Sequence, residues 1–175
     1  FAVNNQETNR FFVSAELDET VLHEIYLPAF ETVVKQAEPW SVMASYNKIN
    51  GTYASEDRSL LTDTLKTRWG YDGVVVSDWG AVRSTTASPN AGMDLEMPGP
   101  PKHFGAKLKA AVEAGEVAPA QIDENARRMV RLILRTGVLD GKPLEKGEIA
   151  TDRHREVARR TAAEAIVLLK NQGVL

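Results

Sequence analysis

The sequence contains no cysteine, so it can form neither a disulfide bond nor a thiolate metal site. It has no apolar run near the ~20 residues that a bilayer-spanning helix needs, and no signal-peptide pattern opens it. Neither sign of charge prevails, because 21 basic residues stand against 24 acidic ones, a net charge of −3. We therefore expect no nucleic-acid partner and no membrane partner. The chain is expected to be soluble, and its compartment stays open: cytoplasm, periplasm and exterior all fit.

The length bounds the fold. The 175 residues can bury one core, but they fall well short of the ~250 residues of a complete eight-stranded α/β barrel. One domain, or a piece of one, is expected. The chain begins at Phe1 without a methionine, so we expect that processing, truncation or excision removed an earlier segment.

Apolar runs and helical periodicity alternate along the chain, which predicts a parallel α/β architecture. A helical pattern surrounds Pro28, which indicates either two short helices or one helix broken at the proline. Ser55 could cap the next helix. The remaining elements are expected as strands at 42–46, 73–78 and 92–97 and helices at 55–69, 103–114, 119–135 and 151–169. We expect the three strands to be adjacent and parallel, with Tyr46 and Asp78 at the same end.

Asp78 is the first candidate for chemistry, because it directly follows a buried-type strand of three valines. Functional residues of parallel α/β folds lie at the carboxyl ends of strands. A carboxylate there can attack the anomeric carbon of a sugar, bind a metal or cap the next helix. Trp79 favours the sugar, because its aromatic face suits the apolar face of a pyranose, although it could also be an ordinary core residue.

Other polar residues near the same edge carry weaker signals. Tyr46 could orient the Asp78 carboxylate by a hydrogen bond, or it could be a buried tyrosine bonded to backbone. Asp94 and Glu96 share one strand face, which makes a metal pair conceivable, but the other ligands are missing and structural hydrogen bonding is the better interpretation. Arg10, taken alone, belongs to an ordinary polar loop.

Four motifs together resemble glycoside hydrolase family 3 of the β-glucosidase type. They are, in chain order, FAVNNQE at 1–7, VMASYNKING at 42–51, YDGVVVSDWG at 71–80 and AGMDLEMPG at 91–99. The match spans nearly the whole chain, because residues 165–175 resemble the helix that leads from the family's barrel into its second domain.

The resemblance implies a retaining β-glucosidase and assigns roles residue by residue. Asp78 matches the catalytic nucleophile, and Trp79 matches the neighbour that stacks on the sugar. Met43 and Tyr46 match residues that line the same subsite, and Arg10 matches an arginine that binds a sugar hydroxyl. The implied substrate is a β-glucoside or oligosaccharide, without a metal or other cofactor.

The resemblance also implies a domain organisation. Residues 1–137 match the C-terminal part of a (β/α)8 barrel, 138–150 a linker, and 151–175 the helix that leads to an absent second domain. The family's Lys-His pair before Phe1, the first barrel strands and the acid/base glutamate are not in this chain. We therefore expect the isolated chain to be inactive, and to aggregate or to associate with the missing barrel and second-domain segments.

Three alternatives stay open. The substrate could be that of a β-xylosidase or a β-N-acetylglucosaminidase, although the segment Asn4 to Glu7 does not resemble the Gly-His-rich segment of the latter branch. The chain could be a non-catalytic fragment that functions only beside other segments. It could also be an unrelated α/β metal enzyme that uses Asp78, Asp94 and Glu96.

Overall fold

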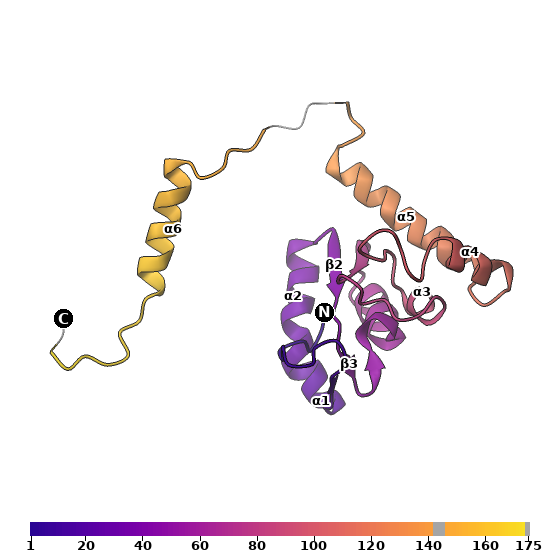
Figure 1. The fold of residues 1–175 in the computed structure, drawn as a ribbon, viewed down its shortest axis with the longest axis horizontal. Coiled ribbons are helices and arrows are strands. Elements are labelled where there is room, and N and C mark those ends of the chain that lie inside the picture. The colour runs from indigo at the N-terminus through magenta and orange to yellow at the C-terminus, as the bar shows by residue number, and fades with distance from the viewer. Residues whose placement is uncertain (142–145, 174–175) are drawn as a thin grey trace. The chain divides into compact units, whose positions relative to one another are not determined.

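The protein is described by a computed structural model that covers residues 1–141 and 146–173. The chain separates into two compact units, 1–139 and 140–175. All strands among the described residues lie in the first unit, and the helix α6 lies in the second (Figure 1).

Two parallel strands form the centre of the first unit. β2 (Ser41–Ala44) pairs with β5 (Val74–Ser77) residue for residue, from Ser41 opposite Val74 to Ala44 opposite Ser77. The amide of Asp78 extends this ladder by donating to the Ala44 carbonyl at 3.1 Å. Because the strands are parallel, the residues that follow them emerge at the same end of the sheet. The prediction that these two strands are adjacent and parallel is confirmed.

The third predicted strand, 92–97, is only partly confirmed. It lies parallel to β5, but it forms a single bridge, between Val76 and Leu95, instead of a regular strand. The Asp94 side chain explains the short pairing, because its carboxylate, rather than a backbone carbonyl, accepts the Val75 amide at 2.8 Å. A side-chain acceptor at this position satisfies the amide but interrupts the ladder.

A small second sheet lies beside the first. β1 (Ser14–Ala15) pairs in parallel with β3 (Lys48–Ile49), and β3 pairs antiparallel with β4 (Thr52–Tyr53). Asn50 and Gly51, which the sequence placed in a loop, form the two-residue turn of this hairpin, with φ values of 49° and 86°. Asn-Gly is the dipeptide that best tolerates two consecutive positive φ angles.

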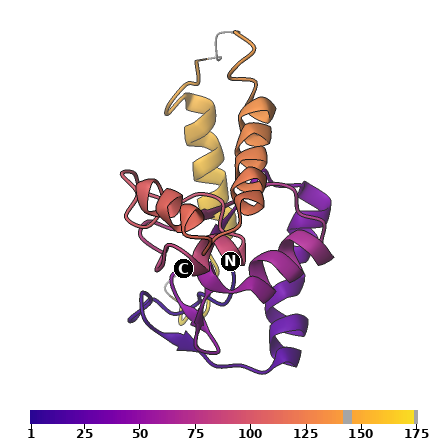
Figure 2. The ribbon, with the colours of Figure 1, turned by 90° about the vertical axis from the view of Figure 1, so that its right-hand side faces the viewer.

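The helical stretch 19–37 is continuous and has a π-helical middle. It comprises α1 (Glu19–Val21), η1 (Leu22–Tyr26) and α2 (Leu27–Ala37). Asp18 begins it by accepting the Val21 amide at 2.8 Å. Pro28 does not break the stretch, because it occupies the start of α2 after the wider π turn, where its missing amide is tolerated. This stretch runs along one side of the unit, in indigo and purple (Figure 2).

The helix that precedes β5 begins later than predicted. A short turn, η2 (Ala54–Glu56), is followed by η3 (Ser59–Arg68). The expectation that Ser55 caps this helix is wrong: its buried hydroxyl donates to the Ala81 carbonyl at 2.8 Å. The capping oxygen is supplied instead by Asp57, which accepts the Leu60 amide at 3.1 Å.

Three helices follow β5: α3 (Ala87–Ala91), α4 (Ala106–Glu113) and α5 (Pro119–Thr136). α5 contacts the loop before β5 through arginines. Arg128 Nη1 donates to the carbonyls of Tyr71 and Gly73, both at 2.9 Å. Arg135 donates two hydrogen bonds to the Asp72 carboxylate, at 2.7 and 3.0 Å. Gly73 fits this crowded loop because a Cβ atom there would lie 2.7 Å from the Trp40 carbonyl oxygen.

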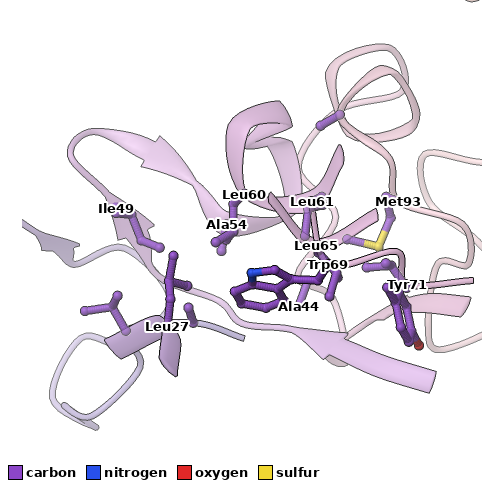
Figure 3. Close-up of a cluster of buried hydrophobic side chains, with 14 of the residues drawn as sticks. Leu27, Ala44, Ile49, Ala54, Leu60, Leu61, Leu65, Trp69, Tyr71 and Met93 are labelled. Atoms are coloured by element: carbon purple, nitrogen blue, oxygen red, sulfur yellow. The ribbon is translucent and has the colours of Figure 1, made fainter. Parts of the chain in front are cut away.

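The core lies on one face of the β2–β5 pair. Val42, Ala44 and Val75 pack into it. Leucines of η3 and the ring of Trp69 belong to the same cluster as Ala44 (Figure 3). On the opposite face Met43 keeps 47% of its surface exposed. Strand side chains alternate between faces, and on this second face Val74 is buried, at 1% exposed, whereas the surface around Met43 is open.

The second unit contains α6 (Asp152–Ala165), which Thr151 caps by accepting the His154 amide at 3.2 Å. The helix ends four residues before the predicted Leu169, and all of its residues are exposed. Parts of the predicted linker (142–145) and of the predicted C-terminal segment (174–175) lie outside the described residues. In the part of the chain that is described, no helix is both long and apolar enough to cross a membrane.

Candidate functional site

Asp78 lies immediately after β5, at the carboxyl end of the sheet. Its carboxylate accepts a hydrogen bond from the Trp79 amide at 2.7 Å, and the backbone carbonyl of Asp78 accepts one from the Ala81 amide at 2.9 Å. The side chain is partly exposed. A backbone turn therefore fixes the position of the carboxylate without removing it from solvent.

Tyr46 lies just after the end of β2 and beside Asp78. Only 5% of Tyr46 is exposed, and its hydroxyl donates to the Trp79 carbonyl at 3.1 Å. Burial raises the pKa of the Tyr46 phenol, and the adjacent Asp78 carboxylate raises it further, whereas the charges of Arg10 and Arg83 oppose the shift. The phenol therefore stays protonated at neutral pH and can act as a hydrogen-bond donor in the site.

Arg10 reaches the same place from the N-terminal segment. Its guanidinium carbon lies 5.1 Å from the centroid of the Tyr46 ring and 5.1 Å from that of the Phe11 ring. The two rings themselves meet edge to face, with centroids 4.5 Å apart. Arg10 also pairs with Glu7 at 2.9 Å, and 38% of its side chain is exposed. A cation is thus held over the aromatic ring that borders Asp78, with part of its surface open to a ligand.

Trp79 and Met43 supply exposed apolar surface near the carboxylate. Trp79 keeps 55% of its surface exposed, so the interpretation as an ordinary core tryptophan does not hold. Met43 and Asp78 line one hollow of about 350 Å³. The structure therefore brings together all five predicted site residues around the carboxyl ends of β2 and β5, although Arg10, Tyr46 and Trp79 do not line that hollow.

Asp94 and Glu96 are engaged in structural bonds. Asp94 accepts two hydrogen bonds from the Lys66 ammonium, at 2.8 and 3.0 Å, and its side chain is fully buried. Burial raises the pKa of the Asp94 carboxyl, and the Lys66 ammonium opposes that shift. Glu96 accepts the amides of Lys102, His103 and Phe104, at distances from 2.7 to 3.2 Å.

These bonds give protein partners to two of the three carboxylates that the metal-enzyme alternative would use. The oxygens of Asp94 and Glu96 already face an ammonium group and four amides. Within residues 1–141 and 146–173, no group of three or more histidine, aspartate or glutamate side chains is placed to hold a metal ion. The sequence interpretation of Asp94 and Glu96 as structural residues is confirmed.

Sequence reasoning missed Phe11 and Arg83. Phe11 forms the ring contact with Tyr46, and Arg83 donates to the Phe11 carbonyl at 2.7 Å. Neither residue stands out by periodicity or spacing. The only available signal was the position of Arg83 in the loop after Asp78, where a residue can reach the same end of the sheet.

Comparison with known proteins identifies the family. The sequence pattern of the glycosyl hydrolase family 3 N-terminal domain matches residues 7–132. A β-glucosidase of Rhizobium radiobacter is 47% identical over all of this chain, which spans 22% of that protein. An exo-α-(1→6)-L-arabinopyranosidase of Bifidobacterium longum is 45% identical, again over the whole chain and 23% of the relative.

Solved structures agree with the sequence match. The family 3 β-glucosidase of Bifidobacterium adolescentis superposes with a TM-score of 0.88 at 46% identity, covering 99% of this chain and 25% of its own. β-Glucosidase 3B of Thermotoga neapolitana, solved with α-D-glucose, gives 0.88 at 35% identity, covering 100% and 25%. The chain spans about a quarter of these proteins, as an α/β fragment of a TIM-barrel-type domain. By sequence and by fold, it belongs to glycosyl hydrolase family 3, a family of glycosidases.

Proposed function

We propose that this chain carries the nucleophile and part of the sugar-binding wall of a retaining β-glucosidase. The observation that carries the proposal is the placement of Asp78: a partly exposed carboxylate at the carboxyl end of β5, beside Tyr46 and the cation of Arg10. The β-glucosidases among its relatives support the glycone, since the Bifidobacterium adolescentis and Thermotoga neapolitana proteins are both β-glucosidases.

In the proposed mechanism an oxygen of Asp78 attacks the anomeric carbon of the bound glucoside. The bond from that carbon to the aglycone oxygen breaks, and a second carboxyl group protonates the departing oxygen. Water, activated by the same second group, then attacks the anomeric carbon, releases glucose and restores the Asp78 carboxylate. Arg10 and Tyr46 would hold sugar hydroxyls, while Trp79 and Met43 would contact the apolar parts of the ring.

The second carboxyl group is proposed to come from outside this chain. Glu96 and Asp94 are held in structural bonds, and Glu56 accepts the Ser88 hydroxyl at 3.4 Å. The open face of β2, where Met43 is exposed, supports the same conclusion, because a closed barrel would turn that face inward. We therefore propose that residues 1–137 are the C-terminal part of the barrel, that 138–150 are a linker and that 151–175 lead to a second domain.

The proposal predicts where a covalent intermediate forms. In the complete enzyme, meaning this chain together with the segments that we propose complete it, a 2-deoxy-2-fluoro-β-glucoside with a good leaving group should label Asp78. Peptide mass spectrometry after proteolysis would locate the added sugar mass. A label on Asp94 or Glu96 instead would show that the nucleophile is assigned wrongly.

The glycone is the second point to test, since one relative is named an arabinopyranosidase. Aryl β-D-glucoside, β-D-xyloside, β-N-acetylglucosaminide and α-L-arabinopyranoside should be compared by kcat/KM in the complete enzyme. We expect the glucoside to be the best substrate. The 175-residue chain alone should show no turnover above background, because general acid catalysis alone contributes roughly 10²–10⁴-fold.

A further inference from the structure

Arg83 connects the loop after β5 with the turn that carries Arg10. Its Nη2 donates to the Phe11 carbonyl at 2.7 Å, a contact between residues 72 positions apart. Its guanidinium carbon lies 4.9 Å from the centroid of the Tyr53 ring and 5.6 Å from that of the Phe12 ring. The side chain therefore lies against two rings while its end donates to the Phe11 backbone.

The backbone of the turn that Arg83 contacts has hydrogen bonds within the turn and at its end. Inside the turn the Val13 amide donates to the Asn9 carbonyl at 2.9 Å. At its end the Val13 carbonyl accepts the Lys48 amide at 2.8 Å, which begins the pairing of β1 with β3. Arg83 supplies a hydrogen bond at Phe11, between this anchored end and Arg10.

We propose that Arg83 is a positioning residue of the site: by holding the Phe11 carbonyl, it keeps Arg10 against the Tyr46 ring beside Asp78. The inference rests on the proposed function, because it assigns Arg83 to the same sugar-binding wall. Phe11 is the link, since its carbonyl accepts from Arg83 while its ring contacts both Tyr46 and the Arg10 guanidinium.

Arg83 affects the site both through its hydrogen bond to the Phe11 carbonyl and through its charge. Its charge also acts on Tyr46, because Arg83 and Arg10 both lower the pKa of that phenol. Removal of Arg83 should therefore change both the position of Arg10 and the titration of Tyr46.

A double-mutant cycle in the complete enzyme tests the positional link. Arg83→Met should lower kcat/KM for an aryl β-glucoside by about tenfold, the scale of a small misplacement of a binding group. In an Arg10→Met background the same change should have almost no further effect, because the group that it positions is gone. Arg83→Lys should lose less than Arg83→Met, since lysine keeps the charge and one donor. Losses that are additive in the cycle would overturn the inference.

The matched control is Arg127→Met. Arg127 is also an arginine, but 65% of its side chain is exposed and it pairs only loosely with Glu124, at 3.6 Å. It should leave kcat/KM and the cycle unchanged. If Arg83→Met fails to fold, Arg83→Lys and Arg83→Gln take its place in the cycle, and the same additivity criterion applies.

A measurement without turnover separates this inference from the proposed function. Tyrosine ionisation, followed by ultraviolet absorbance with a Tyr46→Phe variant subtracted, gives the pKa of Tyr46 in the complete enzyme. Arg83→Met should raise it, because a nearby positive charge is lost, whereas Arg127→Met should not. If Asp78→Asn kept full activity, the proposed function would fail, but this titration would still test Arg83. An unchanged Tyr46 pKa in Arg83→Met would overturn the inference.

Discussion

Asp78 and Asp94 belong to neighbouring parallel segments, yet their carboxylates have opposite surroundings. Asp94 is fully buried and accepts hydrogen bonds from the Lys66 ammonium and the Val75 amide. Asp78 is partly exposed and accepts the amide of the next residue, Trp79. The difference separates two uses of the same functional group. Asp94 joins η3 to β5 and the segment after it, while Asp78 keeps a face that a ligand can reach.

The comparison predicts that substitution of Asp78 and substitution of Asp94 change different properties of the enzyme. The loss of activity in the Asp78 variant is the largest expected effect. In the complete enzyme Asp78→Asn should lower kcat/KM by at least about 10³-fold, since the nucleophile is lost. Its thermal midpoint should change little, because a partly exposed strand-end carboxylate contributes little to folding. Asp94→Asn should mainly lower the thermal midpoint, with a smaller effect on kcat/KM. Initial rates with an aryl β-glucoside, alongside thermal unfolding, measure both.

Removal of the partner of Asp94 tests the buried half of the comparison. Lys66→Met should lower the free energy of unfolding of the complete enzyme by about 3–5 kcal/mol at pH 7, because it leaves a buried charge without its cation. Lys66 opposes the burial that raises the pKa of Asp94, so its loss raises that pKa further. A carboxyl group whose pKa is higher in the folded than in the unfolded protein stabilises the fold at low pH. This contribution is lost as pH rises through its folded-state pKa. The deficit should therefore shrink from pH 7 to pH 5.

Urea unfolding at the two pH values measures this change. Lys109→Met is the control, because Lys109 pairs with Glu113 on the surface and 74% of its side chain is exposed. The control should lose little at either pH. A Lys66→Met deficit that grows on acidification would contradict a raised Asp94 pKa in the variant.

Glu96 extends the comparison to a carboxylate whose hydrogen bonds, in the described part of the chain, all come from backbone amides. Glu96→Gln should lower the free energy of unfolding by about 1–3 kcal/mol, because one carboxylate oxygen is replaced by an amide group that cannot accept. The amides of 102–104 would then compete for a single oxygen. Hydrogen exchange of these amides should accelerate in the variant. Protection equal to that of the unmodified protein would show that water replaces the lost oxygen without cost.

The smallest expected effect concerns Asp72, a carboxylate that is paired but exposed. Arg135 holds the pKa of Asp72 below its usual range through a side-chain hydrogen bond. Arg135→Met should raise that pKa with only a small change in stability, since 54% of the Asp72 side chain is exposed and solvent screens the pair. A carboxyl group whose pKa is lower in the folded than in the unfolded protein stabilises the fold at pH values above its unfolded-state pKa. This contribution is lost as pH falls through its folded-state pKa. An NMR titration of the Asp72 carboxyl in both proteins checks the direction.

The sequence predicted which residues meet at the site better than it predicted the long-range contacts that hold them in place. Three valines before Asp78 and the apolar run before Tyr46 identify parallel strands, and parallel strands place both residues at one end. The bond between Lys66 and Asp94 could not be predicted, because 28 residues separate the partners and no local periodicity relates them. Arg83 and Phe11 lie even farther apart, at 72 positions.

The errors at helix boundaries have local causes. Ser55 and Asp57 are both good capping residues, and the choice between them depends on the buried contact of Ser55 with Ala81. At the other end of the chain, the apolar residues 166–169 continue the helical pattern of α6, but Ile166 is already extended, with ψ of 119°. Residues 166–169 are all exposed, and without packing an amphipathic pattern does not suffice to extend a helix.

The arginine contacts of α5 also bear on the order in which the chain folds. Arg128, Arg131 and Arg135 reach back across 55 to 63 residues to the loop at 71–73, whereas β2 and β5 pair across 33, from Ser41 to Val74. Contacts between distant positions form only after the entropy of a longer loop has been lost. We expect α5 to dock after the strand pair during refolding, and to be the first of these elements to detach in native-state hydrogen exchange.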